Sequence, residues 1–177
     1  MKTLIIIDVQ KGFINEHNEQ MLENIKKISE RGNFDIVIAT QFVNDEKSQY
    51  IKSLNWNAMF SSPEIDFALN LPKGTFVVQK SSYGLPNSMF VKEGLKINEN
   101  LVIPKDSEIY LCGTDYDACV LAIAYQLFDN GFAPKIISNA IGSASRKPVD
   151  KTIVERIMTR NFGRTSVIYD EDLEKDK

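Results

Sequence analysis

The chain is predicted to fold as one α/β domain in which a parallel β-sheet lies between layers of helices. Apolar runs that are typical of strands alternate along the sequence with longer stretches that have helical periodicity. This alternation indicates a parallel sheet with helices on both faces. The 177 residues, 43% of them hydrophobic, can form one substantial core, and no linker, repeat or low-complexity stretch divides them. A single domain is therefore expected over residues 1–177.

The first predicted strand, Thr3–Ile7, is an uninterrupted apolar run rich in β-branched residues, as expected of a central strand buried on both faces. Five further runs predict strands at Asp35–Thr40, Thr75–Gln79, Glu108–Cys112, Lys135–Ser138 and Ser166–Tyr169. Helices are predicted between them at Glu19–Arg31, Asn87–Ile97, Cys119–Asn130 and Asp150–Arg160. The pair Asn130-Gly131 is a strong signal for the end of the third helix.

Three chemically distinct side chains follow predicted strands. Asp8 comes directly after the first strand, Lys80 after the third, and Cys119 follows the loop that leaves the fourth strand. Ligands and catalytic side chains gather at the carboxyl edge of an open parallel sheet, so these three residues are expected to converge there. Taken singly, each also has a structural interpretation: Cys119 as a small packing residue, Asp8 as a turn residue and Lys80 as a solvated charge.

Cys119 lies where a strand and a short loop lead into the first turn of an amphipathic helix, within GTDYDACVLAIAYQLFDNG. Helix N-termini carry unpaired N–H groups and partial positive charge, which favour a thiolate over a thiol. The position therefore predicts a reactive cysteine. A thiolate is a nucleophile for carbonyl carbons.

The ordered motifs resemble the isochorismatase-like cysteine hydrolase superfamily, which includes nicotinamidases and N-carbamoylsarcosine amidase. The matching pattern is Asp8, Gln10 and Phe13 after an apolar strand, Lys80 after a later strand, and Gly113 followed by Cys119 and Val120. The resemblance extends over nearly the whole chain. It implies a three-layer α/β/α fold whose six parallel strands have the order 3-2-1-4-5-6.

The resemblance also implies a mechanism. Cys119 would attack a planar carbonyl, Asp8 would act as the general base and Lys80 would stabilise both anions. The backbone N–H groups of Asp115 and Cys119 would bind the oxyanion, with a cis peptide bond between Thr114 and Asp115. The residues expected to contact substrate are Phe13, Gln10, Tyr116 and Trp56.

The expected substrate is a small amide or carbamoyl compound that is hydrolysed through a thioester. Metal-assisted nicotinamidases carry an aspartate and histidines after the second strand, where this chain has ATQFVNDEKSQY. The one histidine, His17, lies in a polar loop, so no metal site and no cofactor are predicted. Isochorismatases cleave a vinyl ether and do not need the cysteine, so Cys119 favours acyl chemistry.

Other functions remain open from the sequence. They are an isochorismatase-type or nicotinamidase activity, and a non-catalytic domain of the same fold that binds a small molecule or senses redox state. Cys112 is predicted to be structural because it lies inside a strand, and a redox sensor would usually need a resolving cysteine. All three of Asp8, Lys80 and Cys119 are present, which favours the enzyme.

Composition and charge limit the kinds of binding partner and the cellular setting that are expected for this chain. A formal net charge of −3 offers no electrostatic footprint for nucleic acid. The N-terminal apolar run of five residues is too short for a signal peptide or a membrane span. Two cysteines provide no disulfide framework, so a reduced, cytoplasmic setting is expected. The family resemblance further implies a homodimer or a larger homo-oligomer.

Overall fold

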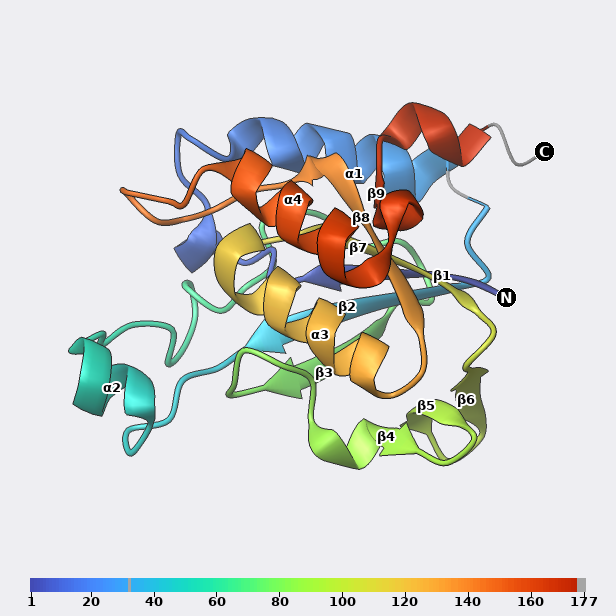
Figure 1. The fold of residues 1–177 in the computed structure, drawn as a ribbon. Coiled ribbons are helices and arrows are strands. Elements are labelled where there is room, and N and C mark those ends of the chain that lie inside the picture. Colours follow the sequence, from blue (N-terminus) through green and yellow to red (C-terminus); the bar gives the residue numbers. More distant parts are fainter. Residues whose placement is uncertain (32, 175–177) are drawn as a thin grey trace.

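The computed structural model describes residues 1–31 and 33–174 and shows a three-layer α/β/α domain (Figure 1). Its central sheet has six parallel strands in the order β3-β2-β1-β7-β8-β9, which confirms the predicted sheet and its strand order. The strands are β1 (Lys2–Ile7), β2 (Ile36–Phe42), β3 (Phe76–Lys80), β7 (Glu108–Gly113), β8 (Ala133–Ile141) and β9 (Val167–Ile168). The helices are α1 (Glu19–Arg31), α2 (Gln49–Leu54), α3 (Leu121–Asp129) and α4 (Lys151–Phe162), with short 3₁₀ turns at Lys11–Phe13, Asn87–Met89, Arg164–Ser166 and Asp170–Glu174.

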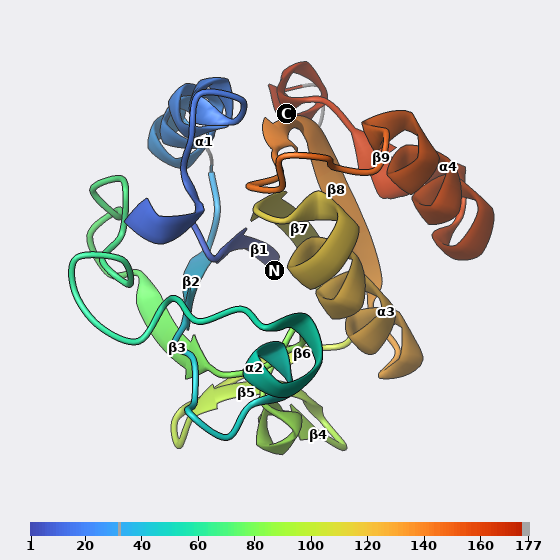
Figure 2. The same cartoon turned by 90° about the vertical axis from the view of Figure 1, so that its left-hand side faces the viewer.

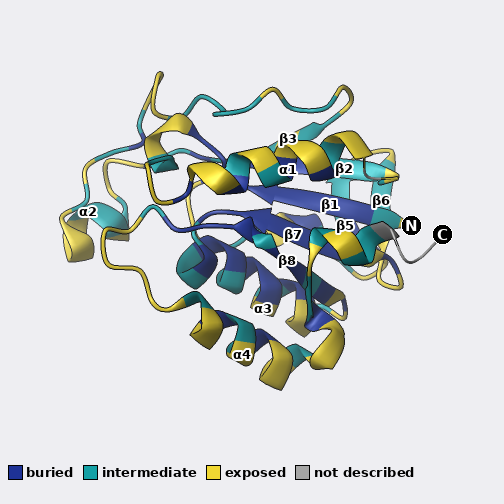
Figure 3. Cartoon of the chain, turned by 90° about the horizontal axis from the view of Figure 1, so that it is seen from above, coloured by how far each residue is buried: buried dark blue, intermediate teal, exposed yellow. Residues whose placement is uncertain are grey.

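Strand β1 is buried on both faces because helices cover both sides of the sheet (Figure 2). Leu4 and Ile6 belong to the apolar cluster beneath α1, whereas Ile5 and Ile7 belong to the cluster beneath α3 and α4. Burial of each such side chain stabilises the fold by about 1.5–3 kcal/mol. Figure 3 shows the result: the central strands are buried, and α1, α3 and α4 bury one face and expose the other. The predicted all-apolar first strand therefore forms the centre of the core.

Helices α1, α3 and α4 begin and end within two residues of three predicted helices, whereas α2 was not predicted. Helix α4 starts after Asp150, whose carboxylate accepts a hydrogen bond from the backbone N–H of Thr152. Helix α3 stops at Asn130-Gly131, where Gly131 takes a φ of 89° that favours glycine. None of the helices in the described ranges has both the length and the apolar character that a membrane span needs.

The predicted helix at Asn87–Ile97 is wrong. After the turn at Asn87–Met89, this segment forms β4 (Phe90–Val91) and β5 (Gly94–Asn98), which pair with β6 (Leu101–Pro104) in a small antiparallel sheet. A Cβ on Gly94 would lie 2.0 Å from the carbonyl oxygen of Ile103, so glycine allows the backbones of β5 and β6 to approach closely. The apolar side chains of Phe90, Leu95 and Ile97 then join the core cluster beneath α3.

Candidate active site

Asp8, Lys80 and Cys119 come together at the carboxyl edge of the sheet. Strand β1 ends just before Asp8, and β3 ends with Lys80, two strands away in the sheet. The Lys80 Nζ lies 2.7 Å from Oδ2 of Asp8 and 3.5 Å from Sγ of Cys119. The parallel register thus places an acid, a cation and a thiol in one cluster.

The Asp8–Lys80 ion pair is buried and held by further hydrogen bonds. The Thr40 hydroxyl, on β2, donates to Oδ1 of Asp8 at 2.6 Å and accepts from the Asp8 backbone N–H at 3.0 Å. Lys80 Nζ also donates to the carbonyl oxygens of Ser82 at 2.8 Å and Tyr83 at 3.4 Å. Charges in a low-dielectric site need such partners. Thr40 is a positioning residue that the sequence reasoning missed, although it ends the predicted second strand at the same sheet edge.

The surroundings of Cys119 favour the protonated thiol. Burial raises the pKa of the Cys119 thiol, and the negative charge of Asp8 raises it further, whereas the nearby Lys80 charge lowers it. A hydrogen bond with Asp8 also favours the protonated form. Desolvation and the adjacent carboxylate thus oppose the thiolate that a helix start favours.

The turn that carries Cys119 is built from unusual backbone. Gly113 ends β7 with a φ of 113°, and a Cβ there would lie 2.1 Å from the carbonyl oxygen of Ile7. The peptide bond between Thr114 and Asp115 is cis. A π-helical turn over Tyr116–Val120 then precedes α3, so Cys119 lies in that turn and not in a regular α-helix.

Asp115 is anchored in this turn through its side chain. Its Oδ1 accepts hydrogen bonds from the Thr114 hydroxyl and, at 2.6 Å, from the backbone N–H of Ala144. Burial nevertheless raises the pKa of the Asp115 carboxyl. Among the described residues, the backbone N–H of Asp115 finds no hydrogen-bond acceptor. That N–H is available to bind an anionic oxygen.

A cavity of about 170 Å³ opens onto Cys119. Asp115, Ala118 and Cys119 form one side of it, and Leu54 with five aromatic rings forms the rest: Phe13, Phe42, Tyr50, Trp56 and Tyr83. This volume equals the share of about five or six molecules of liquid water, so the cavity suits a small ligand. The rings support one another, with Phe13 stacked on Trp56 at 6.0 Å between centroids and Tyr50 edge-on to Tyr83 at 5.0 Å. The cavity is a small, mostly aromatic pocket with a thiol on its wall.

The structure brings only two of the four expected substrate contacts to this cavity. Phe13 and Trp56 line it. Gln10 is fully buried, and its amide bonds both backbone groups of Phe42 and the carbonyl oxygen of Ile65. The Tyr116 hydroxyl donates to the carbonyl oxygen of Val149 at 2.8 Å. Gln10 and Tyr116 thus hold neighbouring backbone in place.

Tyr50 is a lining residue that sequence reasoning missed. It belongs to α2, six residues before Trp56, and its ring contacts those of Phe42, Trp56 and Tyr83. Burial raises the pKa of its phenol, because the charged form loses its contact with water. The only available signal was its aromatic type within the same loop as Trp56.

Gln126 of α3 fixes the turn that follows Lys80. Its side chain accepts from the backbone N–H of Leu85 at 2.7 Å and donates to the Leu85 carbonyl at 2.9 Å. We expect Gln126→Ala to lower the free energy of unfolding by about 1–3 kcal/mol, because buried Leu85 would lose both partners. Chemical denaturation measures this effect, with the exposed Asp129→Ala on the same helix as the control. Equal stability of the two variants would contradict the anchoring role.

The described residues contain no group of three or more histidine, cysteine, aspartate or glutamate side chains that could hold a metal ion. His17 is exposed and pairs only loosely with Glu16, at 3.6 Å. Cys112 is fully buried within β7, and that burial raises the pKa of its thiol.

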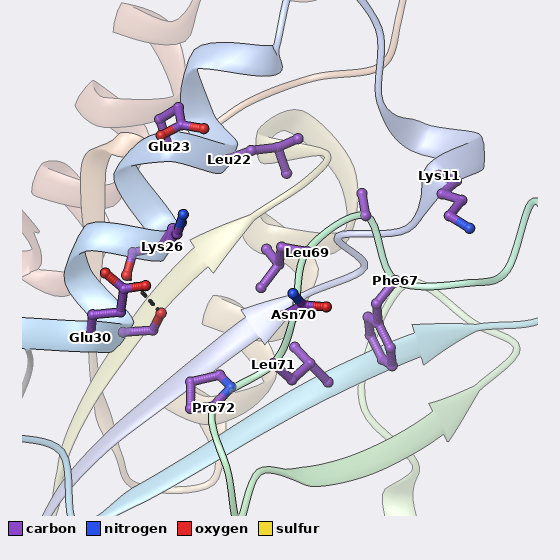
Figure 4. A pocket seen from close by; sticks show the side chains of 12 residues that line it. Lys11, Leu22, Glu23, Lys26, Glu30, Phe67, Leu69, Asn70, Leu71 and Pro72 are labelled. Carbon is purple, nitrogen blue, oxygen red and sulfur yellow. Dashed lines mark hydrogen bonds between the residues drawn. The ribbon is translucent and has the colours of Figure 1, made fainter.

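A larger groove of about 750 Å³ lies elsewhere, between α1 and the segment 67–72 (Figure 4). Phe67 and Leu69 form part of its apolar lining, and Lys26 and Glu30 of α1 line it with opposite charges. Neither Asp8, Lys80 nor Cys119 lines it. The three residues that converge at the sheet edge all lie outside this groove, and Cys119 lines the smaller cavity, which is therefore the candidate active site.

Comparison with known proteins agrees with this architecture. A family model described as the isochorismatase domain matches residues 2–165. No curated protein sequence matches the chain. Similar solved structures include an isochorismatase-like hydrolase from Alkaliphilus metalliredigens (16% identity, 99% of each chain covered, TM-score 0.75). A nicotinamidase from Bacillus subtilis (20% identity, 94% of this chain and 98% of that one, TM-score 0.73) and N-carbamoylsarcosine amidase from Thermoplasma acidophilum (16% identity, 97% and 98%, TM-score 0.70) share the fold.

Proposed function

The chain belongs to the isochorismatase family, and we propose that it is a cysteine hydrolase that cleaves the C–N bond of a small amide or carbamoyl compound. One observation carries this proposal: Lys80 Nζ bridges Asp8 and Cys119, at 2.7 and 3.5 Å, beside a cavity that Cys119 lines. A nucleophile close to a base and a cation can carry out acyl transfer.

The first half of the reaction forms a thioester. Asp8 takes the proton of the Cys119 thiol as Sγ attacks the carbonyl carbon, so no free thiolate has to exist beforehand. The carbonyl oxygen becomes an oxyanion, which the backbone N–H groups of Asp115 and Cys119 bind. Asp8 then returns its proton to the leaving nitrogen, the C–N bond breaks and ammonia or an amine departs.

The second half releases the acid. Asp8, again a carboxylate, accepts a proton from a water molecule that attacks the thioester carbonyl. The C–S bond breaks, and the Cys119 sulfur recovers a proton from Asp8. Lys80 keeps its positive charge throughout and stabilises whichever of the two neighbours is the anion.

The test is ammonia release from a panel of small primary amides, N-carbamoyl compounds and nicotinamide, combined with peptide mapping after an acid quench. A substrate that turns over should leave an acyl group on the peptide containing Cys119. Cys112→Ala is the matched control, because it removes the only other cysteine and should keep both turnover and the adduct. Ammonia release without any adduct on Cys119, under conditions that trap a thioester from a known cysteine amidase, would contradict covalent catalysis.

A further inference from the structure

A second pocket of about 540 Å³ adjoins the cavity at Cys119. It lies between the start of α2 and the turn at 81–83 that follows β3. Tyr50, Leu54 and Tyr83 line both spaces, so the two are neighbours with a common wall. Tyr83 and Leu54 are exposed by 44% and 60%, which leaves this wall accessible from solvent. This space is the outer pocket.

The lining of the outer pocket offers a ligand several hydrogen-bond acceptors. The Ser53 hydroxyl already donates to the Gln49 amide oxygen at 3.0 Å, and the Ser82 hydroxyl already donates to the Gly84 carbonyl at 3.1 Å. The hydroxyl oxygens of Ser53 and Ser82 are therefore available to a ligand as hydrogen-bond acceptors. The Asp45 carboxylate accepts one bond from the Lys47 backbone N–H at 2.7 Å and retains free acceptor capacity. Donors also line the space: the amide nitrogen of Gln49 and the hydroxyls of Ser81 and Tyr83.

The charged residues that line the two spaces favour a cationic ligand over an anionic one. Asp45 lines the outer pocket and Asp115 lines the cavity, whereas no lysine, arginine or histidine among the described residues lines either space. Lys80 does not compensate, because its Nζ is buried and engaged by Asp8, Cys119 and two carbonyl oxygens. A carboxylate on the substrate would therefore find no cationic partner.

Resting on the proposed hydrolase function, we propose that the substrate is an amide with an amine-bearing arm, whose ammonium group binds in the outer pocket while the amide enters the cavity at Cys119. The serine oxygens and the Asp45 carboxylate accept hydrogen bonds from the ammonium group. The aromatic wall of Tyr50 and Tyr83 flanks the methylene chain that joins the two ends. The site discriminates against amides that carry a carboxylate at the same position.

The experiment uses the Cys119→Ala variant as a binding protein and Trp56 as the reporter. Trp56 is the one tryptophan in the sequence and lines the cavity, so its fluorescence follows binding without catalysis. The probes are three amides of matched length: 5-aminopentanamide, hexanamide and glutaramate, which are cationic, neutral and anionic. The cationic amide should bind about tenfold or more tightly than the neutral one, because charged groups strengthen hydrogen bonds, and the anionic amide should bind most weakly.

Asp45→Asn should reduce the preference for the cationic over the neutral amide by about three- to fivefold. Glu46→Gln removes the same charge from the next, exposed position outside the pocket lining and should leave the preference intact. Equal affinity for the three probes, or tightest binding of glutaramate, would overturn the assignment. Failure of the hydrolase function would look different: selective binding of the cation by Cys119→Ala, with no turnover of any amide by the wild-type protein.

Discussion

Replacing Asp8 with asparagine is expected to lower amide turnover by roughly 10²–10⁴-fold while making Cys119 react faster with iodoacetamide. The two effects have one cause. Asp8 is the base that accepts the thiol proton, so turnover falls without it. The same carboxylate raises the pKa of Cys119, whereas Lys80 lowers it, so removal of Asp8 increases the thiolate fraction at neutral pH.

Opposite changes in turnover and alkylation separate this role from simple damage to the site. A misfolded site would lose turnover and expose both cysteines to alkylation, so peptide mapping must show that Cys112 stays unlabelled. Cys119→Ala gives the background level of turnover and of alkylation. Circular dichroism checks that each variant is folded. If Asp8→Asn slows alkylation together with turnover, Asp8 does not hold the proton of Cys119.

The convergence of the three site residues could be predicted from the sequence because strand ends are strong local signals. The apolar run before Asp8 and the strand before Lys80 place both side chains at one edge as soon as the sheet is parallel. No comparable signal marks the ionisation state of Cys119. That state depends on desolvation and on the distances to Asp8 and Lys80, which only the folded chain fixes.

The other features that the sequence did not predict correctly also depend on tertiary contacts. Tyr50 reaches the cavity because α2 folds back over the carboxyl edge of the sheet, and nothing in its local sequence shows that. The segment around Gly94 has enough apolar residues for a helix, but β6 offers it a partner strand at close range. Gln10 belongs to the family motif, yet the folded chain uses its amide to join the backbones near Phe42 and Ile65. A motif identifies a position, and the packing around it decides whether that position touches the cavity.

Replacing Lys80 with methionine is expected to lower the free energy of unfolding by about 3–5 kcal/mol and to eliminate turnover. Methionine has a similar length, so the change is chiefly the loss of the charge. The Asp8 carboxylate would remain buried, and its Oδ2 would lose the ion pair with Lys80. Its Oδ1 would keep the hydrogen bond from the Thr40 hydroxyl. Urea denaturation measures the loss, and ammonia release measures the activity.

The double variant Asp8→Asn with Lys80→Met distinguishes a pair kept for chemistry from one kept for stability. Replacement of both charges removes the uncompensated carboxylate, so most of the stability lost by Lys80→Met alone should return, as is common when a buried ion pair is replaced by uncharged side chains. Turnover should remain at the level of Cys119→Ala. A double variant as unstable as Lys80→Met would instead mean that the ion pair is part of what holds β1 and β3 in the sheet. Recovery of stability without recovery of activity would show that the buried pair is needed for proton transfer at Cys119 and that folding can proceed without it.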